Sequence, residues 1–543
     1  MDGRHKGKAP DDMRSRGPRN SVADIKMDTF DHQDKEEITD AASSSGVSQQ
    51  EVILNEPPKL QRALKARHLT MISLGGTIGT GLFLASGASV ASAGPGGALI
   101  AYALIGIMVF FMMECLGEMA TYLPISGSFN NYAGRFIDPA IGFSLGWNYF
   151  YNWSVTLAVE LVRTIALESE LYWFALIKVL VVIVFVILGI LVDTAVLGGV
   201  YYGMDVFKRG GVQSAGILST FLTASFSFQG TELIGVAAGE SENPRRNVPR
   251  AIKQVFWRIL LFYILSIFIV GLIIPYDDPS LLKNDVSDIT VSPFTLVFLK
   301  AGMDSAAHFM NAVILTTVLS AGNSGLYASS RTLYDLALEG KAPRFFKKVT
   351  RFGVPIYCVL LTSVIGMLAF LTSLFGNGVV YSWLLNISGV AGLIAWLGIA
   401  ASHYRFRRAY VAQGRNVDDL PFKARLFPFG PIFTFLVCLF VLVGQGYDSW
   451  FASPVVAADI IACYIGIPVF LAFYIGYKVV VRSKVIPLME VDLDTGREEI
   501  IRHTMEMDET KRYDPLEGVS MMKPSTWKRI PHNLRSWRDA FHN

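Results

Sequence analysis

The chain has 543 residues, of which 52% are hydrophobic and only 17% charged, and its mean hydropathy is +0.40. This number of charged residues is too small to cover the surface of a soluble globular protein of this length. The composition therefore excludes an ordinary soluble protein. The net charge of +3 says little as a sum, because in a membrane protein the positions of the charges matter.

The two ends of the chain differ in composition from its middle. Residues 1–66 are rich in Asp, Lys, Arg and Ser and contain no apolar core of the kind that a secretory signal requires. We expect them to form a disordered cytoplasmic tail, and residues 483–543 to form a second cytoplasmic tail. The tails are candidates for trafficking or ubiquitin-ligase contacts. Residues 67–482 are the predicted transmembrane transporter domain.

The middle of the chain contains apolar blocks of about twenty residues, the length that an α-helix needs to cross a hydrocarbon layer of about 30 Å. This pattern predicts an all-α, polytopic membrane bundle, whereas a barrel would show alternation. We predict eleven spans, near 69–92, 97–122, 141–162, 171–193, 214–239, 254–275, 305–330, 354–374, 380–402, 431–447 and 456–481.

Basic clusters after the predicted spans indicate their orientation. Three such clusters, at 245–258, 331–351 and 405–415, are each separated by two spans and should all be cytoplasmic. From a cytoplasmic N-terminus, however, five spans would deliver the first cluster to the outside. Either the link 163–170 hides a re-entrant stretch, or one span has the unfavoured orientation, or a helix is missing.

The first span contains an unusual density of glycine, with four glycines between Gly75 and Gly81. Each glycine weakens a helix by about 1 kcal/mol relative to alanine. Such a segment can unwind at mid-membrane, so that freed backbone N–H groups hold an anionic carboxylate. Close helix packing through small residues explains the same spacing equally well. No dinucleotide-binding pattern is formed, because Leu84 stands where a third glycine is needed.

A second interruption lies in the fifth span, over residues 226–232 (Phe-Ser-Phe-Gln-Gly-Thr-Glu). Two broken helices in corresponding positions of two halves are typical of a transporter site. Glu232 lies well inside this span, where a charge costs about 2.5–3.5 kcal/mol, so it should face the bundle interior or be protonated. A helix-to-helix hydrogen bond is the alternative role.

Lys178 lies about seven residues into the fourth predicted span, too deep to reach the interface easily. A lysine buried from water can gain and lose a proton near neutral pH, which favours proton coupling. A structural role, capping carbonyls that the first span frees, is the alternative, and the two roles are compatible. Glu114 and Glu118 are predicted near the cytoplasmic end of the second span.

Motifs of other function classes are missing from the sequence. It contains no phosphate-binding loop, no His-Glu-x-x-His, no Gly-x-Ser-x-Gly and no soluble block large enough for a catalytic domain. The four cysteines have neither a pairing pattern nor metal-ligand spacing. We therefore expect no enzyme, no cofactor, no metal site and no nucleic-acid partner.

Several motifs between Arg67 and Arg482 resemble the fungal amino acid permeases of the amino acid–polyamine–organocation superfamily, which have a LeuT-type fold of two inverted repeats. They are Gly75–Phe83, Ser126–Phe129 with Arg135–Pro139, Phe226–Gly235 with Glu242–Pro249, Gly322–Tyr327, Ala342-Pro343 and Pro428–Pro431. The resemblance implies a secondary transporter that imports amino acids at the plasma membrane, usually together with protons. The run 228–233 looks more like the basic amino acid permeases, which implies lysine or arginine as substrate.

The resemblance also implies roles for individual residues. Backbone groups of Thr77, Ile78, Gly79, Thr80 and Gly81 would hold the substrate α-carboxylate. The region of Phe226, Ser227 and Phe228 would hold the α-amine, Glu232 would gate or tune the site, and Lys178 matches a lysine thought to couple protons in bacterial relatives.

The chain departs from this family pattern at one place. Family members have twelve spans, and here residues 159–162 are joined almost directly to residues 168–170, where relatives carry an extra helix and loop. We therefore expect the fourth helix to be missing, which agrees with the charge argument. Two alternatives to an active carrier remain: an amino-acid sensor that does not transport, and an inactive splice or gene-model variant of a permease.

Overall fold

The structure is a computed structural model that describes residues 64–125, 127–161, 171–282, 292–350, 353–375, 377–451 and 456–497. The predictions for residues 1–63, for the link 163–170 and for residues 498–543 lie outside these residues. The described residues form α-helices and short 3₁₀ helices, together with two isolated bridges. The predicted all-α fold class is confirmed.

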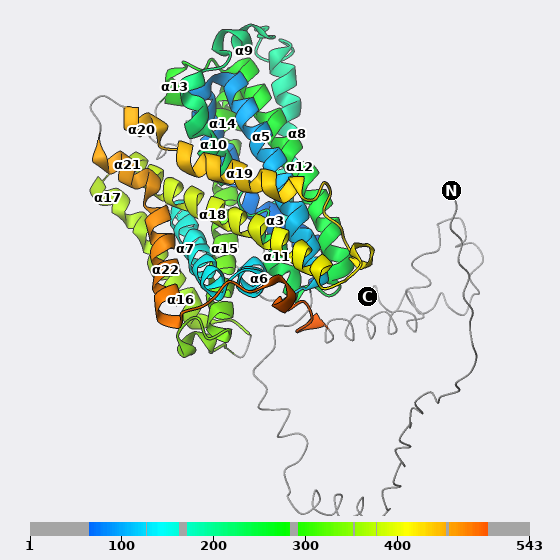
Figure 1. Ribbon diagram of the computed structural model, residues 1–543. Helices are drawn as coiled ribbons and strands as arrows, with labels where there is room; N and C mark the ends of the chain where they lie inside the picture. The colour runs from blue at the N-terminus through cyan, green and yellow to red at the C-terminus, as the bar shows by residue number, and fades with distance from the viewer. Residues whose placement is uncertain are drawn as a thin grey trace, which may run out of the picture. The chain divides into compact units, whose positions relative to one another are not determined.

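The first half of the bundle runs from α3 to α12 (Figure 1). Its helices are α3 Ala66–Thr77, α4 Thr80–Phe83, α5 Ala85–Tyr122, α6 Ser128–Phe136, α7 Pro139–Leu161, α8 Leu171–Asp193, α9 Asp205–Gly210, α10 Ile217–Phe228, α11 Leu233–Val236 and α12 Pro244–Ile273. A 3₁₀ helix, Ala237–Glu240, follows α11. The described parts of the first six predicted spans all coincide with helices or with the two breaks described below.

The second half begins with two short helices, α13 and α14. Its helices are α13 Pro279–Leu282, α14 Pro293–Lys300, α15 Asp304–Leu338, α16 Ile356–Gly366, α17 Thr372–Phe375, α18 Asn377–Ala412, α19 Phe429–Gly444, α20 Tyr447–Phe451, α21 Ala457–Tyr464 and α22 Gly466–Val481. The other five predicted spans are helical over most of their described residues.

Four stretches within the described residues are long and apolar enough to cross a membrane. They are Ala85–Tyr122, His308–Leu338, Ser382–Ala412 and Phe429–Phe451. Three shorter apolar helices, Leu260–Ile273, Ile356–Leu371 and Gly466–Val481, accompany them. Together with the composition, these helices make the chain an integral membrane protein.

The first two predicted spans are joined by a kink rather than by a loop. The helix α5 continues from Ala85 to Tyr122 and contains Gly94 in a left-handed conformation (φ 71°), followed by Pro95. A Cβ on Gly94 would lie 2.7 Å from the carbonyl oxygen of Gly210. Glycine is therefore required there both by the backbone angle and by the neighbouring chain.

The helices pack in two groups that meet around α10 and α11. One group brings α5 against α12 and α10, and the other brings α7 against α15 and α18. Several large aromatic side chains are fully buried where the groups meet, and they carry polar atoms into the interior: Tyr102, Tyr149, Tyr263, Trp153 and Trp396. Buried aromatic rings with a polar end need partners, and most of these rings reach the breaks described below.

A buried ion pair joins α5 to α18. Glu118, fully buried, accepts hydrogen bonds from two guanidinium nitrogens of Arg407, of which Nε lies 2.6 Å from Oε1. The backbone N–H of Ala424 also donates to Glu118, over 2.6 Å, and His403 Nε2 lies 3.3 Å away. The sequence analysis predicted only that Glu118 lies near a helix end.

Residues 482–497, which follow α22, pack across the ends of α6 and α18. The N–H of Ile486 donates to the carbonyl of Ile137 over 2.9 Å, and Gln413 Nε2 donates to the carbonyl of Val491 over 2.8 Å. Leu493 is 1% exposed. The beginning of the predicted C-terminal tail is therefore an ordered strap on the transmembrane domain.

The strap should release from the bundle in acid. The Arg415 guanidinium binds Asp494 through two hydrogen bonds of 2.9 and 2.5 Å and lowers the pKa of that carboxyl below its ordinary 3.8. A carboxyl whose pKa is lower in the docked state stabilises docking above pH 3.8 and loses this effect as the pH falls below it. We expect hydrogen exchange of residues 486–497, corrected for intrinsic rates, to accelerate below pH 4. An Asp494→Asn variant with the same pH dependence would contradict this assignment.

Candidate substrate site

The first predicted break is present in the structure. The helix α3 ends at Thr77 and α4 begins at Thr80, and between them Ile78 and Gly79 have non-helical backbone angles. Gly79 has φ −141° and ψ −147°. Four glycines in seven residues weaken the helix where it breaks, as the sequence predicts.

The second predicted break lies between α10, which ends at Phe228, and α11, which begins at Leu233. Gln229 is extended and Gly230 has φ +99°, a backbone conformation that residues with a side chain rarely adopt. The N–H of Gly230 donates to the carboxylate of Glu232 at 3.2 and 3.1 Å. The side chain of Glu232 therefore satisfies a donor that the broken helix would otherwise leave unpaired.

The two breaks lie side by side, with glycines at the points of contact. A Cβ on Gly81 would lie 2.6 Å from Cα of Ser227, and a Cβ on Gly230 would lie 2.8 Å from the carbonyl carbon of Gly76. The hydroxyl of Ser73 donates to the carbonyl of Gly230 over 3.1 Å. Small-residue packing and helix breaking, which the sequence offered as alternatives, therefore occur together here.

Tyr263, on α12, holds the two breaks together. Its hydroxyl lies 2.9 Å from the carbonyl oxygen of Thr77 and 2.6 Å from that of Ser227. Its ring stacks on Phe228 with centroids 4.9 Å apart. The sequence analysis missed this residue, although a tyrosine inside an apolar span is a signal for a buried hydroxyl that needs partners.

Glu232 lies at the junction of three helices and is 1% exposed. Its Oε1 accepts a hydrogen bond of 3.2 Å from the Tyr149 hydroxyl of α7, and its Oε2 accepts one of 3.2 Å from Trp396 Nε1 of α18. The carboxylate thus connects the broken helix to both neighbouring helices. Its predicted position facing the bundle interior is confirmed.

Lys178, on α8, also reaches the first break. It is 1% exposed, and its Nζ donates to the carbonyl of Gly75 over 2.8 Å. Gly75 lies in the last turn of α3, just before the break. The structure therefore places the lysine where the capping hypothesis predicted it.

A comparison with protein-family models gives one matching family, described as amino acid permease, over residues 68–168 and 167–487. The chain belongs to this amino acid permease family. It is accordingly a membrane transporter rather than an enzyme.

Curated relatives of this permease occur in bacteria and fungi. The lysine-specific permease LysP of Escherichia coli (strain K12) is 53% identical over 463 residues, covering 78% of this chain and 94% of the relative. The histidine permease HisP of Lactococcus lactis is 46% identical over 473 residues, covering 80% and 98%. The basic amino-acid permease of Saccharomyces cerevisiae is 39% identical over 493 residues, covering 82% and 86%. The fungal relative that we compare is thus more distant than the bacterial ones.

A polar cluster of the permease beside the second break was missed from the sequence. Gln229 Nε2 donates to the carbonyl of Ser388 over 3.0 Å, and the Ser388 hydroxyl donates to Asn152 Oδ1 over 2.8 Å. Thr156 lies 2.6 Å from the same hydroxyl. No local pattern in the sequence predicts this cluster, because Asn152 and Ser388 are 236 residues apart in the chain.

Two hydroxyl groups of α15 near the first break have no hydrogen-bond partner among the described residues. They are the buried hydroxyls of Ser320 and Thr317. Ser320 Oγ lies 3.7 Å from the position that a Cβ on Gly75 would take. Buried polar groups without a partner are rare, and a polar ligand would supply one.

Proposed function

We propose that this permease imports basic amino acids, lysine or arginine, together with protons. The observation that carries this proposal is the pair of adjacent helix breaks, one between α3 and α4 and one between α10 and α11. Relatives whose names specify lysine or basic amino acids support the substrate class. We propose the plasma membrane as the location, with the basic clusters and the N-terminus on its cytoplasmic side.

In this proposal, backbone groups at the two breaks bind the zwitterionic end of the substrate. Thr77, Ile78, Gly79, Thr80 and Gly81 hold the α-carboxylate, because N–H groups at the start of a helix attract negative charge. Carbonyl oxygens of Phe226, Ser227 and Phe228, at the end of α10, hold the α-amine. Glu232 tunes the site beside the second break, because its carboxylate accepts hydrogen bonds from Tyr149 of α7 and Trp396 of α18.

Lys178 would carry the transported proton. A charged lysine has three donors and forms a stronger hydrogen bond to the Gly75 carbonyl than a neutral one does. Loss of its proton therefore weakens the contact between α8 and α3 and allows α3 to move. In this mechanism, the lysine that caps the Gly75 carbonyl also carries the transported proton.

Replacing Lys178 by glutamine should uncouple uptake from protons. Glutamine keeps an N–H donor on a side chain that is one bond shorter, and it carries no charge at any pH. We expect uptake of labelled lysine into proteoliposomes to lose its response to an imposed pH gradient and to fall by about ten- to a hundredfold, while Lys348→Gln, an exposed control, behaves as the native chain. A Lys178→Gln variant that still accumulates lysine in response to the gradient would contradict the assignment.

We also propose that this chain has a LeuT-type fold of two inverted repeats without its fourth helix. The family match is divided into two parts that meet at residues 167–168. The Escherichia coli relative aligns over 463 positions, whereas 78% of 543 residues is about 424, so about 40 positions face no residue of this chain. Both observations support an omitted segment of about one helix and a loop.

The directions of α7 and α8 support the same conclusion. Val159, near the end of α7, clusters with Val380 at the start of α18, and Phe185, in the later half of α8, packs on Phe294 of α14 with centroids 4.0 Å apart. Because α15 crosses the membrane and α16 with α17 returns, α14 and the start of α18 lie on one side. Consecutive helices α7 and α8 thus both run toward that side, and the nine residues between them are too few for a helical span of about twenty.

Restoring the omitted segment should raise activity. We expect a chimera that carries the corresponding segment of about 40 residues from the Escherichia coli relative between residues 162 and 168 to take up labelled lysine at least tenfold faster than the present chain. A scrambled apolar insert of equal length is the matched control. If neither the chain nor the chimera binds or moves any basic amino acid, the proposed function is wrong, and binding without flux in both would support a sensor.

A further inference from the structure

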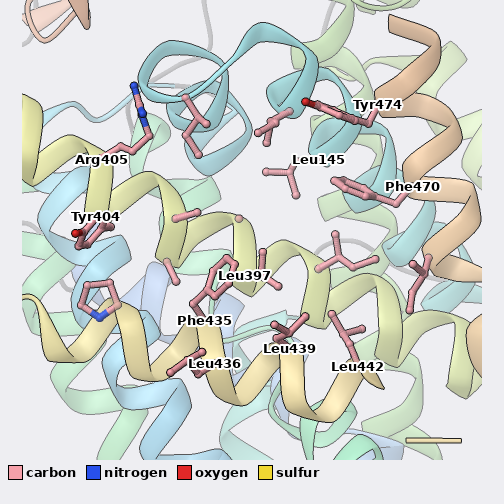
Figure 2. A pocket seen from close by; sticks show the side chains of 18 of the residues that line it. Leu145, Leu397, Tyr404, Arg405, Phe435, Leu436, Leu439, Leu442, Phe470 and Tyr474 are labelled. Atoms are coloured by element: carbon pink, nitrogen blue, oxygen red, sulfur yellow. The ribbon is translucent and has the colours of Figure 1, made fainter. Parts of the chain in front are cut away.

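An apolar cavity of about 770 Å³ lies away from the helix breaks, on the outer side of α18. Figure 2 shows it between α18, α19 and α22, with Tyr404 and Arg405 at one end and Leu442 toward the other. Leu436 and Leu439, on its wall, are 56% and 44% exposed. The cavity therefore opens on the surface that faces lipid.

The length of the cavity corresponds to one membrane leaflet. Its lining runs along α18 from Ile394 to Arg405, twelve residues whose ends are about 17 Å apart along the helix axis. Half of a hydrocarbon layer of about 30 Å is about 15 Å. The end at Arg405 lies on the side of the basic clusters, so the cavity occupies the cytoplasmic leaflet in the orientation proposed above.

Two tyrosines that line opposite sides of the cavity each have a cation over the ring (Figure 2). Arg408 lies over Tyr404 with 5.8 Å between guanidinium carbon and centroid, and Lys478 lies over Tyr474 at 5.9 Å. Tyrosine belongs at the level of the headgroups, and each nearby cation attracts anionic lipid. Arg408 is exposed, whereas Lys478 also pairs with Asp138.

We propose that the cavity binds an acyl chain of an anionic phospholipid, with the headgroup phosphate near Arg408 and Tyr404. A transmembrane helix of a partner or of a second copy is less favoured, because the exposed cation over Tyr404 complements an anionic headgroup and has no counterpart on an apolar helix. The lipid would lie behind α18, the helix that positions Trp396 and Ser388 at the site, so its presence would support the geometry of the second break.

The test counts bound lipid and does not require transport. The full chain is delipidated in mild detergent, and native mass spectrometry measures the binding of added phosphatidylglycerol and phosphatidylcholine. We expect one tightly bound phosphatidylglycerol per chain. Arg408→Gln should weaken phosphatidylglycerol binding about fivefold, the effect of one cation at an anionic headgroup, and leave phosphatidylcholine binding unchanged. Ala401→Leu, which enlarges a residue that lines the cavity, should weaken the binding of both lipids at least tenfold.

Two matched controls locate the effect. Lys348→Gln removes an exposed cation elsewhere, and Ala472→Leu enlarges an exposed alanine of α22 outside the cavity lining; both should bind lipid as the native chain does. Equal binding by Arg408→Gln, Ala401→Leu and the controls would overturn the proposal. The proposal would also be overturned if the native chain were a dimer and Ala401→Leu made it a monomer without changing lipid binding. In that case a second copy of the chain would occupy the cavity. Failure of lysine transport would leave this result unaffected.

Discussion

Replacing Gly230 by alanine is expected to abolish binding of basic amino acids. The residue has φ +99°, which costs a residue with a side chain about 1–3 kcal/mol. The new methyl group would also lie 2.8 Å from the carbonyl carbon of Gly76 and 3.0 Å from the amide nitrogen of Thr77, so the breaks must separate. We expect the affinity of the purified chain for labelled lysine to fall at least a hundredfold, or about 2.7 kcal/mol.

A second glycine provides the matched control. Gly476 lies in α22, and a Cβ there would meet nothing within 4 Å. Gly476→Ala should therefore bind lysine as the native chain does, and circular dichroism should show that both variants keep their helical content. If Gly230→Ala also binds lysine with native affinity, the close contact between the two breaks is not needed for binding.

Replacing Glu118 by glutamine is expected to cause a large loss of stability. The substitution leaves the guanidinium of Arg407, which is 7% exposed, buried without its charge partner. Removing one partner of a buried ion pair typically costs about 3–5 kcal/mol. We expect this loss in the free energy of unfolding, measured by denaturant titration of the purified chain in detergent.

Two further variants test the reason for this loss. The double variant Glu118→Met, Arg407→Met removes both charges and should be less destabilised than Glu118→Gln, because no unpaired charge stays buried. Asp418→Asn breaks an exposed ion pair with Lys423 and should change stability by less than about 1 kcal/mol. A Glu118→Gln variant as stable as Asp418→Asn would show that the buried pair contributes little.

The fold follows from patterns that are local in the sequence. Blocks of about twenty apolar residues specify membrane helices, and the structure is helical over nearly all their described residues. The position of Gly94 and Pro95 was predicted as a boundary between two spans, whereas the structure has a kink there. Glycine and proline interrupt the apolar pattern in the same way whether the helix ends or bends, so the sequence does not distinguish the two. The proposal that a helix is omitted arose from charge position, because the basic clusters impose a parity on the number of spans that hydropathy alone does not.

The two helix breaks of the candidate site were predictable from the sequence, whereas the side chains that join them to the other helices were not. Gly79 and Gly230 carry their own signal, since glycine in a span marks a position where a helix can break. Tyr263, Trp396 and Ser388 join the site through contacts with residues far away in the chain, and no local spacing predicts which residues of α12 and α18 face the breaks. For such residues only the packing of the bundle decides the partner.

The central claim is that the two adjacent helix breaks bind the amino acid, and hydrogen exchange tests it most directly. Exchange is followed by mass spectrometry in peptides covering residues 74–84 and 226–236, with and without saturating lysine, and a peptide within 466–481 of α22 serves as reference. We expect lysine to slow exchange at least tenfold in both break peptides and to leave the reference unchanged. Lysine that binds but leaves both break peptides unchanged would contradict the claim.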